Sequence, residues 1–336
     1  MKGENRTDIE YPKGLFTEVV LSFLEYKRSL GYKYDDGRMY TLRSILKKLN
    51  SYKRDKANLT KEMVFDVIEK RENESDETQI VRVTLIRQLA IFMEIKGYEA
   101  YILPPYFITY KKTIFKAFIY TEDEIIRLIN VCDEYCKNSN TLSLSSQTVY
   151  PFFIRVLYGG GLRISEALRL KGQDVDLKNR SLFIRESKYY KSRYIPMSNS
   201  LVNCLRTYEE LKKERCIQSN DDSYFPSPDG YRFSKSAVSR MIKMWICQSQ
   251  VRKTDEGVYP RIHDLRHTAA VRILENLDKS GQDLNINIPL LSVFLGHDNI
   301  VETEQYLQFP VYSFNRINEQ PLINSIIPEV GNEYEK

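Results

Sequence analysis

The sequence of 336 residues has no long apolar runs and no paired cysteines. No stretch approaches the roughly 18 apolar residues that a membrane span needs, and the opening MKGENRTDIEYPKG has no signal-peptide segment. The five cysteines are an odd, scattered set without a CxxC pair, so we expect reduced thiols. These absences favour a cytoplasmic protein without a membrane partner.

Familiar cofactor motifs are missing as well. The triplet GGG at 159–161 has neither GxGxxG spacing nor a Walker lysine, so we expect no nucleotide cofactor. In HDLRH, His263 and His267 have the i,i+4 spacing of a metal pair, but no HExxH motif or cysteine partner supplies further ligands. We therefore expect no metal, although a metal pair remains an alternative. On a helix, His263 and Arg266 would share one face.

Positive charge is concentrated near the N-terminus, although the net charge is only +5. Between Lys27 and Lys56 the chain has ten Lys or Arg residues against three Asp, and tyrosines lie among them. Such a segment is typical of a surface that binds a phosphate backbone, but two solvated helix faces would have the same composition. The candidate phosphate contacts here are Lys47, Lys48, Lys53 and Arg54.

Residues 12–103 have the pattern of a small all-α domain. Apolar residues recur at helical spacing, and glycines end two of the predicted helices, which cover 15–30, 36–50, a stretch after Thr60, and 77–96. Two prolines interrupt the pattern at 104–105. A basic linker is predicted over 104–118, with Lys111 and Lys112 as further candidate phosphate contacts.

A second domain is predicted over 119–311, mainly helical with one small β-hairpin. Thr121 and Glu124 have the spacing of a capping box, which predicts that a helix begins there. In SLFIRES the alternation turns Leu182 and Ile184 inward, and RYIPM is expected to return as the partner strand. Residues 312–336 form a weakly patterned tail. The fold class is therefore an all-α domain followed by an α+β domain.

The phrase GLRISEALRL follows the glycine triplet and predicts a helix that starts near its arginine. Arg163 would lie in the first turn, beside free backbone N–H groups, with Glu166 at i,i+3. A guanidinium in this place suits an anion, because it can bind two phosphate oxygens at once. The alternative is an ordinary Arg–Glu pair on the surface.

The predicted hairpin turn, ESKYYKSRYIP, contains Lys188, Lys191 and Arg193. A lysine at a hairpin tip can reach into a groove, although exposed lysines are common on any surface. Further along, Pro289 is expected to start a helix that ends at Gly296. His297 follows this glycine, and Tyr306 lies nine residues later.

Together and in this order, these motifs resemble the tyrosine recombinase (phage integrase) family. The resemblance covers about 120–310 and rests on GLRISEALRL, the K-x-x-K-x-R-x-x-P hairpin, HDLRH, and LGH followed by tyrosine at plus nine. It implies that 119–311 is the family's catalytic domain and that 12–103 is a SAM-like core-binding domain. The phrase TEQYL, in place of the TTQIYTH usual in chromosome-dimer resolvases, favours a mobile-element integrase.

The resemblance implies site-specific recombination of double-stranded DNA by a homotetramer, without metal, ATP or another cofactor. Tyr306 would attack the scissile phosphate and form a 3′-phosphotyrosyl link. Ionising a tyrosine at neutral pH costs roughly 3–4 kcal/mol, so a base or a cationic site is needed. The implied helpers are His263 as general base, Lys188 as general acid with Lys191 as its rival, Arg163 and Arg266 as the phosphate clamp, His297 as a phosphate donor, and Glu166 as the residue that orients them. Lys191 and Arg193 are candidate DNA contacts, and 312–336 would dock on a neighbouring subunit.

Two alternatives remain. A type IB topoisomerase uses similar chemistry without partner-strand exchange, but the compact helical front domain and the HxxR motif favour a recombinase. A non-catalytic DNA-binding relative would bind without cleavage. The intact set of candidate residues argues against this second alternative.

Overall fold

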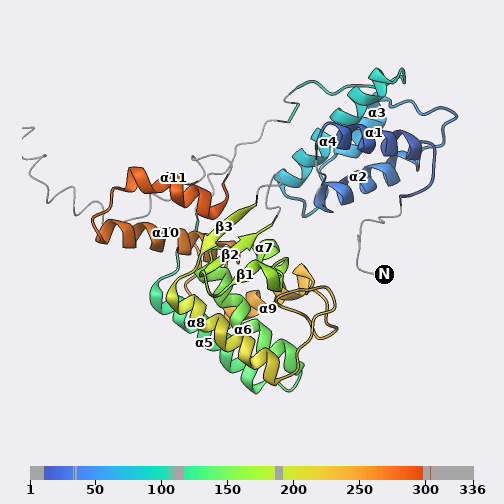
Figure 1. Cartoon of the computed structure of the whole chain (residues 1–336). Helices are drawn as coiled ribbons and strands as arrows, with labels where there is room; N and C mark the ends of the chain where they lie inside the picture. The colour runs from blue at the N-terminus through green and yellow to red at the C-terminus, as the bar shows by residue number, and fades with distance from the viewer. Residues whose placement is uncertain are drawn as a thin grey trace, which may run out of the picture. The chain divides into compact units, whose positions relative to one another are not determined.

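The computed structural model describes residues 11–32, 34, 36–105, 107–108, 117–185, 192–297 and 303. The chain divides into two compact units, Met1–Ile114 and Phe115–Lys336. Figure 1 colours the chain from blue in the first unit to orange-red near the end of the second. Over the described ranges, no helix is long and apolar enough to cross a membrane.

The first unit is built around its longest described helix, α4. Apolar residues at helical spacing let α4 contact α1, α2 and α3, and together they form one core. The helices are α1 (Thr17–Ser29), α2 (Asp36–Leu49), α3 (Lys61–Ile68) and α4 (Asp76–Ile95). The helices predicted from the sequence are confirmed, and their ends differ by one or two residues.

Local capping explains where these helices begin and end. The hydroxyl groups of Thr60 and Ser75 accept backbone N–H bonds at the starts of α3 and α4. Gly31 and Gly97 follow α1 and α4 with φ angles of 80° and 83°, a conformation that favours glycine. The predicted glycine stops are therefore confirmed.

The second unit has a helical body around α6, which contacts α5, α8 and α10. Its apolar side chains share one core with the sheet and with Trp245, the single tryptophan. Thr121 and Glu124 form the predicted capping box, with both reciprocal hydrogen bonds present. The helices are α5 (Glu122–Asn138), α6 (Leu144–Gly159), α7 (Ile164–Leu168), the 3₁₀ turn η1 (Gly172–Asp174), α8 (Asn199–Glu214), α9 (Lys235–Gln248), α10 (His263–Lys279) and α11 (Leu284–Leu295).

A three-stranded antiparallel sheet of order β1-β2-β3 packs against this body. In β2 (Ser181–Ile184) and β3 (Arg193–Pro196), Leu182 lies opposite Ile195, and both side chains are buried. The two predicted strands are thus confirmed. β1 (Val175–Asp176) was not predicted, because two residues are too few to show an alternation pattern.

Helices α10 and α11 lie side by side in the second unit (Figure 1) and share a small apolar cluster. The prediction that Pro289 starts α11 is wrong, because the helix begins at Leu284 and includes the proline. Leu284 and Ile288 continue the apolar face one turn earlier and pack in the same cluster. These contacts hold the preceding turn helical despite the hydrogen bond that proline cannot make.

Candidate active site

The glycine turn before Arg163 brings three segments together. Gly161 has a φ of 58°, and a Cβ there would lie 3.3 Å from the ring of Phe294 on α11. The Gly161 carbonyl accepts a 2.9 Å hydrogen bond from Nη1 of Arg266 on α10. Glycine suits both this conformation and this close approach, so α10 and α11 meet directly beside Arg163.

Arg163 is the N-cap residue of α7 rather than part of its first turn. Its Nη1 donates to Oε1 of Glu166 at 2.8 Å, which is the predicted i,i+3 pair. Glu166 is only 3% exposed, so the alternative of a surface pair is wrong. The Arg163 side chain keeps 20% of its surface exposed, whereas the carboxylate that holds it is buried.

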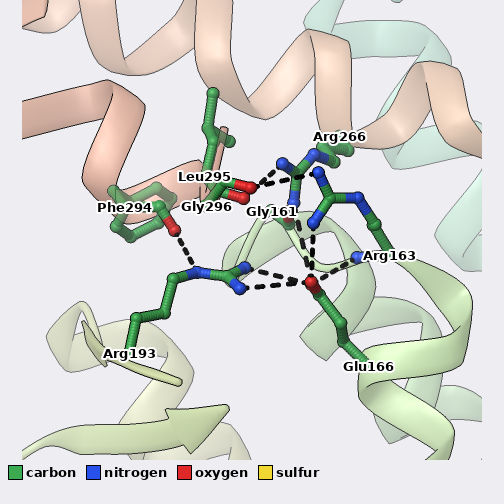
Figure 2. Close-up of polar contacts among 8 residues, drawn as sticks. All are labelled: Gly161, Arg163, Glu166, Arg193, Arg266, Phe294, Leu295 and Gly296. Carbon is green, nitrogen blue, oxygen red and sulfur yellow. Dashed lines mark hydrogen bonds and ion pairs between the residues drawn. The ribbon is translucent and has the colours of Figure 1, made fainter. Parts of the chain in front are cut away.

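Glu166 binds three arginines that come from three elements (Figure 2). Besides Arg163, Arg193 of β3 donates from Nη1 to Oε1 at 3.1 Å and from Nη2 to Oε2 at 3.0 Å. Nη1 of Arg266 lies 3.7 Å from Oε2. Three guanidinium charges against one carboxylate leave an excess of two positive charges, and such a cluster favours a phosphate group.

The C-terminal end of α11 accepts hydrogen bonds from the same three arginines (Figure 2). The last carbonyls of a helix have no partners within it and carry the negative end of its dipole. The donor and acceptor pairs are Arg193 with Phe294 at 2.8 Å, Arg266 with Leu295, and Arg163 with Gly296 at 3.2 Å. β3, α10 and α7 are thereby each joined to one of the three residues that precede His297.

Arg193 differs from its prediction. We expected Arg193 to contact DNA; it begins the predicted strand β3, but its side chain is only 7% exposed and points into the protein. The alternation of β3 explains this, since Arg193 and Ile195 are both on its buried side. The prediction of an exposed DNA contact at Arg193 is wrong, and the pattern RYIP could have indicated its inward position.

Helix α10 begins with HDLRH, and Arg266 within it is 1% exposed. The rings of His263 and His267 meet edge to face, with centroids 4.7 Å apart, and His267 is buried. Over the part of the chain that the structure describes, no three His, Cys, Asp or Glu side chains group in a way that could hold a metal ion.

His297 stands directly after Gly296, and a hydroxyl group faces its ring. Nδ1 of His297 lies 2.8 Å from Oγ1 of Thr303, which is fully buried. When the hydroxyl donates to Nδ1, the ring proton is on Nε2, which can then donate to an anion. No sequence pattern had indicated a role for Thr303.

Burial and nearby positive charge lower the pKa values of all three histidines. Desolvation, followed by the charges of Arg266 and Arg163, lowers the pKa of His263 to about 4; protein atoms crowd its ring although the residue as a whole is exposed. The same three causes lower the pKa of His297 to about 3. Desolvation and then His263 lower the pKa of His267 to about 3. All three rings are neutral at pH 7, so His263 can accept a proton.

Several predicted residues lie outside the described ranges: Lys111, Lys112, Lys188, Lys191 and Tyr306. Their roles stay predictions. In the first unit, the four candidate phosphate contacts on and just after α2 are exposed, namely Lys47, Lys48, Lys53 and Arg54. Lys48 also forms an ion pair of 2.7 Å with Asp66 of α3.

The sequence of this chain is similar to those of known proteins. Residues 119–310 match the sequence profile described as the phage integrase family. An inferred integrase/recombinase of Sinorhizobium fredii, y4rB, is 26% identical over 294 residues, which cover 87% of this chain and 92% of that protein. The tyrosine recombinase XerA of Thermococcus kodakarensis is 27% identical over 210 residues, covering 62% of this chain and 64% of its own.

Two solved structures share the fold at low sequence identity. The XerH site-specific recombinase, bound to its difH substrate before cleavage, aligns with a TM-score of 0.59 and 16% identity, covering 92% of this chain and 97% of XerH. The Tn1549 transposon integrase, in complex with transposon right-end DNA, aligns with a TM-score of 0.56 and 17% identity, covering 91% of this chain and 99% of that one. Because the matched family profile spans more than half of the sequence, the chain belongs to the phage integrase family of tyrosine recombinases, which are DNA strand-transferring enzymes.

Proposed function

We propose that this protein cuts and rejoins double-stranded DNA at a specific site, with Tyr306 as the nucleophile that forms a 3′-phosphotyrosyl intermediate. The observation that carries the proposal is the convergence of Arg163 and Arg266 on one buried carboxylate, although the two arginines are about a hundred residues apart in the chain. Two positive charges in excess suit a phosphodiester whose negative charge grows in a pentavalent transition state. One preorganised donor of this kind is worth roughly 3–4 kcal/mol.

The two histidines beside the arginines have complementary tasks. Neutral His263 accepts the proton of the Tyr306 hydroxyl group, and His297 donates from Nε2 to a non-bridging oxygen. A phosphate anion bound between Arg163 and Arg266 would offset the positive charges that His263 faces. The pKa of His263 would therefore rise toward its usual range in the DNA complex, which would make it a stronger base.

We assign Lys188 as the general acid that protonates the leaving 5′-oxygen, with Lys191 as the rival. The first unit is assigned as the DNA-binding core-binding domain, with the exposed cations Lys47, Lys53 and Arg54 on the phosphate backbone. The two structural neighbours solved with DNA support a DNA substrate. The proposal also includes assembly as a homotetramer over two DNA sites, in which residues 312–336 dock on a neighbouring subunit. We further propose that the protein is cytoplasmic and is the recombinase of a mobile element.

A nicked suicide duplex that carries the cognate recombination site tests the proposal. The nick lets the short leaving strand diffuse away, so a covalent protein–DNA adduct accumulates and is seen on a denaturing gel. Wild type should form the adduct and Tyr306→Phe should form none, because the phenylalanine ring has no attacking oxygen. Arg163→Ala and Arg266→Ala should each reduce the rate by about 100-fold or more.

Four outcomes would contradict parts of this proposal. An adduct that persists in Tyr306→Phe would assign the nucleophile elsewhere. Binding without any adduct would favour a non-catalytic relative, and an adduct without joining to a second duplex would favour a topoisomerase. Loss of cleavage in EDTA would bring back a metal role for His263 and His267.

A further inference from the structure

We infer that Arg193 is a positioning residue of the active site, because its guanidinium binds Glu166 and the carbonyl end of α11 at once and so sets where Arg163, Arg266 and His297 stand around the scissile phosphate. This inference rests on the proposed function, since it concerns the geometry in which the phosphate is held. It assigns to Arg193 a role that acts through other residues rather than through contact with DNA.

Each nitrogen of the Arg193 guanidinium has an acceptor inside the protein. Nη1 and Nη2 bind the two oxygens of Glu166 at 3.1 and 3.0 Å, and Nε binds the carbonyl of Phe294 at 2.8 Å. The side chain is 7% exposed. Figure 2 shows it reaching Glu166 from a different side than Arg163 and Arg266. Arg193 therefore fixes the carboxylate independently of the two clamp arginines.

The same guanidinium packs against the backbone beside His297. A Cβ placed on Gly296 would lie 2.7 Å from Nη1 and 2.9 Å from Cζ of Arg193. Gly296 has a φ of 65°, so both space and backbone favour glycine at this position. Arg193 thus contacts the residue immediately before His297. The pKa of His297 is lowered first by desolvation, then by the charges of Arg266 and Arg163 and by His263, and last by the charge of Arg193.

The arrangement needs the planar fork of arginine. A lysine ammonium is a compact point charge and cannot bind both carboxylate oxygens and a carbonyl on its other side in this geometry. Without the fork, Glu166 is free to turn toward Arg163 and Arg266. The clamp arginines then donate to the carboxylate instead of the phosphate. Where the cation is lost as well, as in Arg193→Met, the excess positive charge of the cluster also falls from two to one.

The test compares cleavage of a normal nicked duplex with cleavage of one that has an uncharged methylphosphonate at the scissile position. Arg193→Met should slow adduct formation on the normal duplex by about 100-fold, the scale expected for misplaced catalytic groups. Its deficit relative to wild type should be clearly smaller on the methylphosphonate, because a neutral phosphorus centre needs less positive charge. Arg193→Lys keeps the charge but not the planar fork, and it should also form the adduct slowly. This second variant keeps the test valid if Arg193→Met does not fold.

A matched control exists elsewhere in the second unit. Arg155 on α6 binds both oxygens of Asp133 at 2.8 and 2.6 Å and also the carbonyl of Pro151 at 2.8 Å. Arg155→Met removes the same three-acceptor pattern from a different place, and it should cleave both duplexes at nearly the wild-type rate. An equal deficit of Arg193→Met on both duplexes, or a wild-type rate in Arg193→Lys, would overturn the inference.

A second readout needs no DNA. The chain has only three histidines, so their ring N–H correlations can be followed by NMR at pH 7. Arg193→Met should shift the signals of His297, and Arg155→Met should leave them in place; an unmoved His297 would overturn the inference. A wild type that forms no adduct on cognate DNA would instead contradict the proposed function, and the NMR comparison would still decide the role of Arg193.

Discussion

At the scale of single residues, the site separates side chains that face a substrate from side chains that hold them in place. Arg163 keeps part of its surface exposed, whereas Arg193 and Glu166 are almost completely buried. Buried charges are costly unless they are paired, and here each buried charge has an opposite partner. Arg163 therefore holds positive charge at the boundary where a phosphate can reach it, and Arg266, which is 1% exposed, adds a second charge directly beneath.

The contact between Thr303 and His297 leads to a prediction about the imidazole proton. Thr303→Val keeps the shape of the side chain but removes the hydroxyl group that faces Nδ1 at 2.8 Å. The proton can then shift to Nδ1, and Nε2 loses its ability to donate to the phosphate. We expect adduct formation to slow by about 10-fold, the scale of one hydrogen bond of roughly 1.4 kcal/mol, with a changed tautomer of His297 in the ring ¹⁵N spectrum.

The control for this change is Thr207→Val on α8, where the hydroxyl group binds the carbonyl of Asn203. It should cleave as wild type does. An unchanged cleavage rate in Thr303→Val, together with an unchanged tautomer, would show that the hydroxyl group does not direct the proton of His297.

The choice between Lys188 and Lys191 can be made with a substrate whose leaving group needs no acid. A bridging 5′-sulfur leaves as a thiolate of much lower pKa than an alkoxide, so protonation by a lysine becomes unnecessary. We expect Lys188→Met to be severely slow on the normal duplex and close to wild type on the sulfur-bridged one. Rescue of Lys191→Met instead, measured in the same single-turnover assay, would exchange the two assignments.

At the scale of elements, the sequence predicted those features whose cause is local. Thr121 with Glu124 and the glycine stops of α1 and α4 were confirmed because capping depends on a few neighbouring residues. The predicted start of α11 at Pro289 was wrong, because apolar contacts with α10 determine where the helix begins. The preference of proline for the first turn of a helix does not take such contacts into account. β1 escaped notice because only its pairing with β2 defines it.

The end of α11 gives a prediction that separates backbone strain from loss of the arginine contact. Gly296 and Gly281 follow α11 and α10, with φ angles of 65° and 75°. A Cβ on Gly281 meets nothing within 4 Å, whereas one on Gly296 meets the Arg193 guanidinium. Alanine should cost about 1–2 kcal/mol of unfolding free energy at either position, from the left-handed backbone alone.

Gly296→Ala should lose more stability than Gly281→Ala, and only Gly296→Ala should lose cleavage activity. Chemical denaturation of the two variants, with adduct formation measured in parallel, makes the comparison. Equal losses of stability with full activity in both variants would mean that the Arg193 side chain can move away from the new Cβ without harm. The close approach of Arg193 to Gly296 would then have no bearing on catalysis.

At the scale of the whole molecule, the sequence indicated which residues form the site but not how they hold one another. The order of Arg163, Arg266 and His297 in recognisable phrases was enough to predict the family, which the comparisons confirmed. The capping of α11 by three arginines could not be predicted, because the bonds from Arg163 and Arg193 each span more than a hundred residues of the chain. Long-range pairing of this kind depends on the folded topology rather than on local patterns.

The neutral histidines make the stability of the second unit sensitive to acid. In the unfolded chain a histidine binds a proton below a pH of about 6.5, whereas the folded-state pKa of His267 is about 3. Between these values the unfolded state binds more protons, so stability falls as the pH falls. For His267, which is 6% exposed, lowering the pH from 7 to 5 should cost about 2 kcal/mol, and the partly exposed His297 should add less.

Trp245 allows this to be measured in the second unit, because it is the single tryptophan of the chain and is fully buried there. Urea unfolding followed by its fluorescence at pH 7 and pH 5 gives the loss for wild type and for His267→Gln. The glutamine cannot titrate, so the variant should lose about 2 kcal/mol less between the two pH values, whatever its stability at pH 7. Carboxylates that are protonated in this range act equally in both proteins and cancel. An identical pH dependence in the two proteins would mean that the folded-state pKa of His267 is not lowered, so that its ring is charged in the folded protein at pH 5 as well. The positive charges around it would then have to be balanced by more than Glu166.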